Sequence, residues 1–168
     1  AGDRPDSVPV SAAQTRLWFI NRLDPASPTY NMAGAVRLGA QVDVEALGQA
    51  VADVVVRHES LRTRFVEVGG EPTQVVDPVE SVESVVSVVE TDDVDDEMAR
   101  VAAAGFDLGA GAFRAVLVSG PQTSLLVVVV LHHIIGDGAS LRPLIGDVLT
   151  AYNARRYEIG RASCRERV

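Results

Sequence analysis

The chain is short of cysteine and of positive charge, and each shortage excludes a class of protein. Its 168 residues include one cysteine, Cys164, so no internal disulfide can form, and this cysteine usage is typical of a reducing compartment. The 15 Lys and Arg residues stand against 23 Asp and Glu, which gives a net charge of −8. Such an acidic chain lacks the basic patch that nucleic acids and anionic membranes need, so we expect neither as a partner.

Long apolar segments are missing as well. The longest apolar run, residues 125–131, is seven residues long, whereas a membrane-spanning helix needs about 20. The N-terminus lacks the charged segment followed by an apolar one that marks a secretory signal. We therefore expect a cytoplasmic protein whose 168 residues form a single domain with its own core.

That apolar run leads into two of the three histidines, and then into Gly136-Asp-Gly138. A β-branched run closed by a Gly/Asp cluster is typical of a strand buried on both faces. Catalytic groups are commonly placed on loops that a rigid scaffold holds. Because successive side chains of a strand point to opposite faces, His132 and His133 should diverge, so they cannot bind one metal or one substrate together.

Asp137 lies four residues after His133, beyond Gly136, which permits a sharp turn. Its carboxylate could fold back to a histidine or pair with a cation from elsewhere in the chain. A purely structural explanation also stays open at this point. It consists of a core histidine with satisfied ring nitrogens and an aspartate that caps the next helix.

Hydrophobic periodicity and capping residues predict four helices. Ser11 and Gln14 have the spacing of a capping box, and as a helix cap Gln14 needs no functional explanation. The acidic run of residues 91–97 is interpreted as a solvated helix start rather than a metal site. The predicted helices cover residues 12–23, 44–58, 97–104 and 140–155.

Alternating and β-branched segments predict the strands, with Gly69-Gly70 as a hairpin turn. The fold class is therefore α/β, an α+β sandwich with helices packed on a mixed, largely antiparallel sheet. One predicted strand follows the segment of residues 57–65 and leads into the hairpin turn. The other predicted strands cover residues 32–38, 71–76, 82–89, 113–118 and 123–131.

Three stretches resemble, in order, the core motifs of the condensation domains of nonribosomal peptide synthetases. They are Ser11-Ala-Ala-Gln-Thr-Arg-Leu-Trp18, Arg57-His-Glu-Ser-Leu-Arg-Thr-Arg-Phe65 and His132-His-Ile-Ile-Gly-Asp-Gly138. The resemblance implies a chloramphenicol acetyltransferase-like fold, in which two lobes form a V around the active site. Residues 8–160 would be the N-terminal lobe, after a linker at 1–7 and before a non-native tail at 161–168. The motifs of the second lobe are missing, and Ala139 stands where the family often has Trp.

The resemblance also implies a mechanism, in which a carrier-bound amine attacks a carrier-bound thioester to form a peptide bond. His133 would position the amine or take its proton, and Gly138 would direct a backbone N–H at the oxyanion and start the next helix. Asp137 would brace the loop through a salt bridge, with Arg62 or an arginine of the second lobe as partner. His132 would be structural. The substrates arrive on phosphopantetheine arms, and no bound cofactor or metal is expected.

The expected partners are the upstream and downstream peptidyl carrier domains, the missing C-terminal lobe and an adjacent adenylation domain of an antibiotic-type synthetase. The isolated lobe would be inactive. Pro28-Thr-Tyr-Asn31 favours a subtype that joins an L-configured donor, but the joined residues are not encoded in one lobe. The alternatives are an epimerization domain or another carrier-dependent acyltransferase, and a non-catalytic module that docks carrier proteins.

Overall fold

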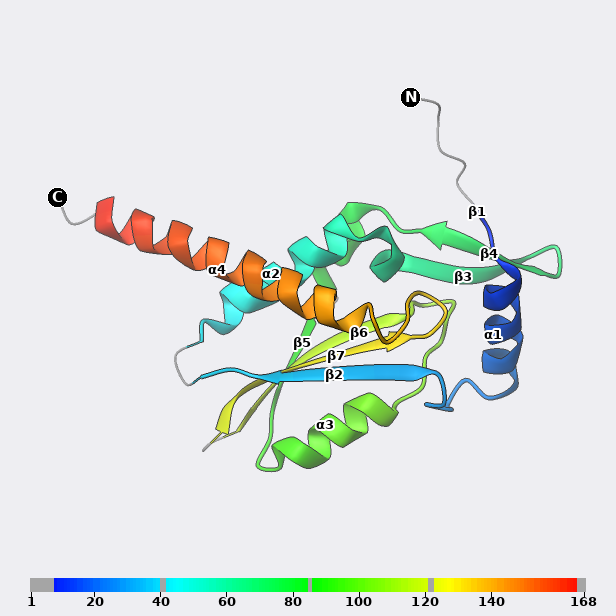
Figure 1. Cartoon of the computed structure of the whole chain (residues 1–168), viewed down its shortest axis with the longest axis horizontal. Helices are drawn as coiled ribbons and strands as arrows, with labels where there is room; N and C mark the ends of the chain where they lie inside the picture. Colours follow the sequence, from blue (N-terminus) through cyan, green and yellow to red (C-terminus); the bar gives the residue numbers. More distant parts are fainter. Residues whose placement is uncertain (1–7, 40–41, 85, 121–122, 166–168) are drawn as a thin grey trace, which may run out of the picture.

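A four-stranded mixed sheet forms the centre of the protein (Figure 1). The computed structural model describes residues 8–39, 42–84, 86–120 and 123–165. The strand order is β2-β7-β6-β5, in which β5 and β6 are parallel and the other two pairings are antiparallel. The bounds are Asn31–Arg37 for β2, Val86–Glu90 for β5, Phe113–Gly120 for β6 and Thr123–His132 for β7.

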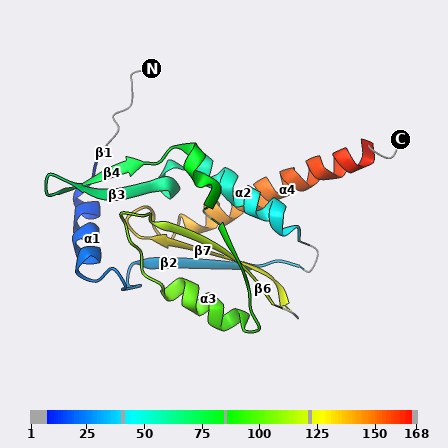
Figure 2. The same cartoon turned by 180° about the vertical axis from the view of Figure 1, so that it is seen from behind.

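A second, smaller sheet has the order β1-β4-β3 and is antiparallel throughout. Seen from behind, its hairpin lies beside the first helix (Figure 2). Gly69 and Gly70 make the hairpin turn with φ of 62° and 89°, a left-handed conformation that glycine adopts without strain. The bounds are Val8–Pro9 for β1, Thr63–Val68 for β3 and Glu71–Val76 for β4.

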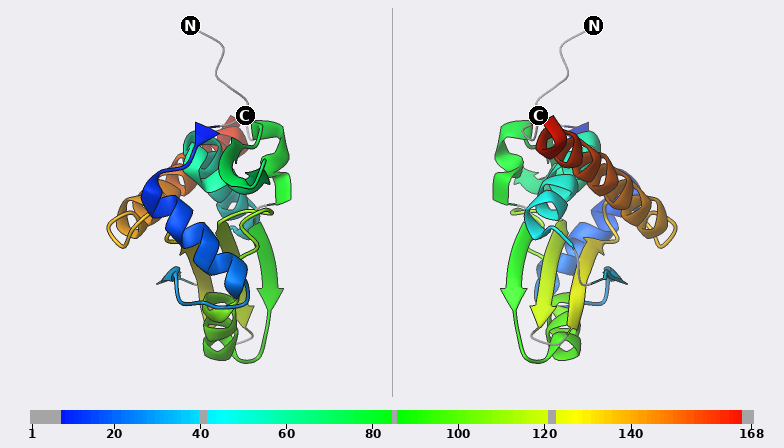
Figure 3. Two further views of the ribbon diagram at one scale, coloured as in Figure 1. Left: turned by 90° about the vertical axis from the view of Figure 1, so that its right-hand side faces the viewer. Right: turned by 90° about the vertical axis from the view of Figure 1, so that its left-hand side faces the viewer.

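Helices cover both faces of the central sheet. Figure 3 shows α2 and α4 crossing at one side of the molecule and α3 at the opposite side. Among the described residues, no helix is both long and apolar enough to cross a bilayer. The bounds are Ala12–Leu23 for α1, Val44–Arg57 for α2, Val94–Ala103 for α3 and Leu141–Arg165 for α4, with 3-10 helices η1 at Glu59–Arg62 and η2 at Val79–Ser84.

Strand β7 is buried on both faces, as predicted. One set of its side chains packs against α2 and α4, and the alternating set packs against α1 and α3. This alternation assigns each side chain from Leu125 to Leu131 to one of two cores. The first set is Leu125, Val127, Val129 and Leu131, and the second is Leu126, Val128 and Val130.

The structure corrects the prediction of a strand over residues 82–89. Residues 79–84 form η2 instead, because the backbone N–H and the hydroxyl of Ser81 both donate to the Pro78 carbonyl, at 3.1 and 2.7 Å. Val82 is buried against the core beneath α2, and the strand begins only at Val86. Hydrophobic alternation alone could not distinguish this turn from an extended segment.

Two helix boundaries also differ from the prediction. Helix α3 begins at Val94 rather than at residue 97, because the Asp93 carboxylate accepts from the Asp96 N–H at 2.9 Å. The acidic run is therefore a helix start, as predicted. Helix α4 continues past residue 155 to Arg165, so residues 161–165 of the expected tail are helical, and 166–168 lie outside the described residues.

Gly105→Ala should destabilise the fold, because the backbone of Pro25 and Ala26 occupies the space of a side chain there. A Cβ on Gly105 would overlap the Pro25 carbonyl oxygen and lie 2.7 Å from the Ala26 carbonyl carbon. The Arg114 guanidinium holds the Gly105 carbonyl at 2.8 Å, so the segment cannot easily retreat. We expect chemical denaturation to show a free energy of unfolding lower by about 1–3 kcal/mol.

The matched control is Gly48→Ala, in the interior of α2. A Cβ on Gly48 meets nothing within 4 Å, and alanine is the better helix former, so this variant should gain up to about 1 kcal/mol. Equal stabilities for Gly105→Ala and the wild type would contradict the close packing.

Candidate functional site

The loop after β7 begins where neighbouring segments hold its backbone. The N–H of His132 donates to the Ala112 carbonyl, and the N–H of His133 donates to the Tyr30 carbonyl, both at 2.9 Å. The N–H of Ile135 then donates to the His132 carbonyl at 3.1 Å, which closes a tight turn. The position of the histidine pair is therefore set by β7 and by the segments on either side of it.

His132 points into the core. Its side chain is 2% exposed, and its ring lies 6.1 Å from the rings of both Tyr30 and Phe106, centroid to centroid. Nδ1 accepts from the Ile134 N–H at 3.1 Å, so the neutral ring carries its proton on Nε2. Burial, with a smaller contribution from the charge of His133, lowers the pKa of His132 to about 4.

His133 points outward and is exposed, so the two rings diverge as predicted. Its Nδ1 lies 2.8 Å from the Gly136 carbonyl oxygen. Because a carbonyl oxygen only accepts, Nδ1 of the neutral ring is the protonated nitrogen. Nε2 then carries a lone pair, which can accept a proton or a hydrogen bond from a bound molecule. This is the arrangement that a general base requires.

Asp137 fixes the turn between the loop and α4. Its Oδ1 accepts from the N–H and from the hydroxyl of Ser140, at 3.0 and 2.7 Å, and the Asp137 N–H donates to the same hydroxyl at 3.2 Å. The hydrogen bonds from Ser140 hold the pKa of Asp137 below its ordinary value, so the carboxylate is ionised at neutral pH. The carboxylate closes this turn and does not fold back onto a histidine.

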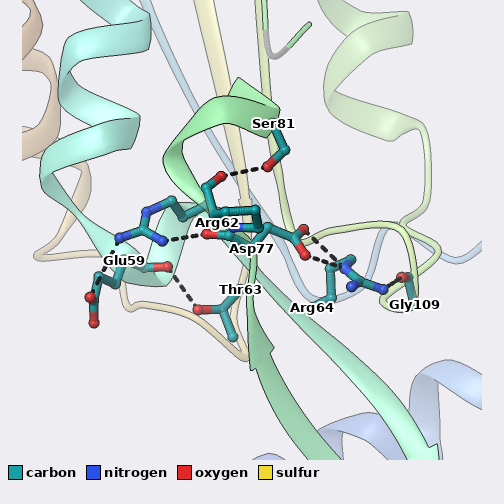
Figure 4. A network of polar contacts seen from close by, with 8 residues as sticks. Glu59, Arg62, Thr63, Arg64, Asp77, Ser81 and Gly109 are labelled. Carbon is teal, nitrogen blue, oxygen red and sulfur yellow. Dashed lines mark hydrogen bonds and ion pairs between the residues drawn. The ribbon is translucent and has the colours of Figure 1, made fainter. Parts of the chain in front are cut away.

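Arg62 lies elsewhere, in η1, where it braces the end of β4 (Figure 4). Its guanidinium donates to the Asp77 carbonyl and pairs with Glu59 at 3.4 Å. Arg64 holds both carboxylate oxygens of Asp77, at 2.7 and 2.9 Å. In the part of the chain that is described, Asp137 and Arg62 have separate partners. The Asp137–Arg62 salt bridge proposed from the resemblance is therefore not formed within this lobe.

Gly138 lies on the exposed part of the same turn. A Cβ built there would meet nothing within 4 Å, so the backbone at Gly138 is open on that side. Helix α4 begins only at Leu141, with Ser140 accepting the Leu144 N–H. The expectation that Gly138 starts the helix is thus wrong by three residues, because the Asp137–Ser140 turn intervenes. A role at an oxyanion stays a prediction.

Two residues at the site were not identified from the sequence. Tyr30 supplies the carbonyl that fixes the His133 backbone, and Gln14 donates its side-chain N–H to the Ile134 carbonyl at 3.2 Å. Both contacts join segments more than 100 residues apart along the chain, and a single sequence carries no direct signal for such pairs. The only local hint is that Gln14 and the histidine pair both lie in recognised motifs.

Metal ligands do not converge on the loop or on the acidic run. Among the residues that the structure describes, no cluster of three or more His, Cys, Asp or Glu side chains could hold a metal ion. In the acidic run, Asp93 caps α3, and Asp95 lies 3.6 Å from the Arg37 guanidinium.

Comparison with known proteins gives one family. The family model described as Condensation domain matches residues 5–160. The chain is 45% identical over 157 residues to a dimodular nonribosomal peptide synthase of Bacillus subtilis (strain 168). That alignment covers 91% of this chain but 7% of the relative, so the chain spans a small part of it.

Solved structures agree on the fold. The starter condensation domain of the rhizomide synthetase RzmA superposes with a TM-score of 0.76 at 22% identity, over 89% of this chain and 38% of that one. The X-domain in its complex with OxyB from teicoplanin biosynthesis gives a TM-score of 0.78 at 28% identity, over 94% and 35%. The chloramphenicol acetyltransferase-like architecture inferred from the motifs is thereby confirmed.

The buried ring of His132 should make the protein less stable in mild acid. In the unfolded chain histidine binds its proton near pH 6.5, whereas in the folded chain the pKa of His132 is lowered to about 4. Between these values the unfolded state binds more protons, so the free energy of unfolding falls as the pH falls. The integrated loss should reach about 3 kcal/mol, measured by chemical denaturation between pH 7 and pH 4.

His132→Asn is the matched variant for this measurement. The asparagine oxygen can still accept the Ile134 N–H, but the side chain does not titrate. Other acid-titrating groups are common to both proteins, so the difference between the two pH curves isolates His132. Parallel curves would show that His132 is not the group responsible.

Proposed function

The chain belongs to the Condensation domain family, and we propose that it is the N-terminal half of a cytoplasmic catalytic domain that joins two carrier-bound substrates through a peptide bond. The observation that carries this proposal is the state of His133. Its ring is exposed, and its Nδ1 proton is directed at the Gly136 carbonyl, which leaves Nε2 for a substrate. A family member with this group preserved has the means to perform the general reaction of the family.

The proposed reaction is an acyl transfer. The acceptor's α-amine attacks the carbonyl carbon of the donor thioester, the carbon–sulfur bond breaks, and the thiolate leaves. An α-amino group has a pKa near 8, so a part of it is neutral and nucleophilic at neutral pH. Nε2 of His133 accepts a hydrogen bond from the amine or takes its proton, which is then returned to the leaving thiolate. No bound cofactor takes part.

The rigidity of the loop is as important as the basicity of the ring. Both substrates are tethered to phosphopantetheine arms, so orientation can contribute more to the rate than proton transfer does. The His133 backbone is held by Tyr30, and the far side of the loop by the turn of Asp137 and Ser140. The backbone N–H of Gly138, on the exposed turn, is our candidate for stabilising the oxyanion.

In this proposal, the rest of the active site and the substrates are supplied by a second lobe and by neighbouring domains. The chain corresponds to 38% of the rhizomide synthetase condensation domain, so a second lobe would supply the other wall and the arginine for Asp137. Carrier domains on either side would deliver the substrates, and an adenylation domain would load them. We therefore expect the chain alone to be inactive.

A docking role without catalysis is the second candidate, favoured by one comparison. The X-domain from teicoplanin biosynthesis was solved in complex with OxyB, and its fold matches this chain with a TM-score of 0.78. A domain that contains this fold can therefore bind another protein. An epimerization domain or another carrier-dependent acyltransferase would share the histidine loop. The product that it forms would distinguish it from a condensation domain.

Formation of a carrier-bound dipeptide tests the proposal. The chain alone, the chain joined to the second lobe of a related condensation domain, and the joined form with His133→Ala are incubated with two loaded carrier proteins. Mass spectrometry of the carriers should find dipeptide with the joined wild type and none with the chain alone. His133→Ala should lower the rate by about 100- to 10,000-fold, the usual contribution of a general base.

His58→Ala serves as the matched histidine control. His58 follows the last residue of α2 and pairs through Nε2 with Asp147 of α4 at 2.7 Å, away from the His133 ring, so its loss should leave the rate within a few-fold of the wild type. Absence of dipeptide from a joined form with a cooperative unfolding transition would overturn the catalytic proposal and favour the docking role. An epimerised but unextended donor would assign the epimerization alternative.

A further inference from the structure

The side chain of Gln14 links the first helix to the histidine loop. Its Oε1 accepts from the Ser11 N–H at 2.9 Å, which completes the capping box of α1. Its Nε2 donates to the Ile134 carbonyl at 3.2 Å and to the Gln74 side-chain oxygen at 3.4 Å. The orientation of the amide follows from its partners, because the Ser11 N–H only donates and the Ile134 carbonyl only accepts.

Helix capping by itself does not explain a glutamine at this position. Glutamate at the third helical position completes a capping box equally well, since the cap needs an acceptor only. The Ile134 carbonyl needs a donor, which a carboxylate at neutral pH lacks. The amide at position 14 is therefore matched to the loop as well as to the helix.

The loop contact falls next to the reacting group. Ile134 follows His133 directly, and its side chain is 3% exposed, so it anchors the loop in the core. Along the chain, the Ile134 carbonyl lies between two held groups. The His133 N–H before it donates to the Tyr30 carbonyl, and the Gly136 carbonyl after it accepts a hydrogen bond from the His133 ring. A rotation of the peptide after Ile134 would therefore move the Gly136 carbonyl that supports the His133 ring.

Gln14 is itself held in place from the small sheet. Gln74 on β4 accepts from Gln14 and donates its own Nε2 to the Pro9 carbonyl of β1 at 3.1 Å. The two glutamines thus form a chain of hydrogen bonds from β1 through β4 and α1 to the loop. A side chain fixed at both ends can transmit the position of the small sheet to the loop.

We propose that Gln14 is a positioning residue for His133, acting through the Ile134 carbonyl. Its effect on the reaction rests on the function proposed above, whereas its effect on the loop does not. The role is distinct from helix capping, and the two can be separated by substitution.

Gln14→Glu is the test, because it keeps the size of the side chain and the cap but replaces the donor by a second acceptor. Amide hydrogen exchange, read by mass spectrometry on the joined two-lobe form, should be faster in the peptide that covers residues 132–138. We expect an increase of roughly two- to tenfold, the equivalent of one net hydrogen bond. In the dipeptide assay kcat should fall about tenfold or more, with KM for the carriers unchanged.

Ser11→Ala is the matched control, since it removes the hydroxyl that caps the Gln14 N–H at 3.2 Å and leaves the Gln14 amide intact. It should lower the melting temperature without changing exchange in 132–138 or kcat. Unchanged exchange in Gln14→Glu, or equal effects of the two variants, would overturn the proposal. Faster exchange with an unchanged kcat would also overturn it. If the wild type forms no dipeptide, the exchange result still decides the loop contact.

Discussion

The site depends on the alternation of side chains along β7. Because both faces of this strand are covered from Leu125 to Leu131, each of these side chains points into one of two cores, and a shift of register by one residue would exchange the two sets. The pairing of Leu131 with Phe113 of β6 and Met32 of β2 fixes that register. His132 is thereby buried among aromatic rings, and His133 is the first side chain of the strand's end to reach solvent.

The loop beyond β7 is held by contacts of the kind that end helices and turns. Tyr30 contributes a carbonyl, Gln14 a side-chain amide, and Asp137 with Ser140 closes the turn before α4. Each such bond contributes about 0.5–1.5 kcal/mol net. Together these hydrogen bonds restrain the loop from three sides, and they leave the His133 ring with one supported orientation. Such pre-organisation favours catalysis by orientation.

The sequence was sufficient wherever one local pattern decided the structure. The buried run before His132, the Gly69-Gly70 hairpin and the Ser11–Gln14 capping box are such cases. It failed at η2, where Pro78 and Ser81 close a turn inside an apparently alternating segment. The partners of Arg62 and Gln14 were missed because tertiary folding brings them together. The residue type of neither side chain indicates which group it will bind. The roles of the loop residues in catalysis remain proposals.

The two adjacent histidines have different surroundings, and physical chemistry explains how one shapes the turn that orients the other. The tight turn leaves the Ile134 N–H inside the core, where an unpaired donor costs about 1–3 kcal/mol. Nδ1 of His132 accepts it, which an apolar residue could not do. Burial keeps that ring neutral down to a pH of about 4, since its pKa is lowered to that value, so it adds no charge beside His133. His132 therefore forms the turn, and the turn directs His133 outward.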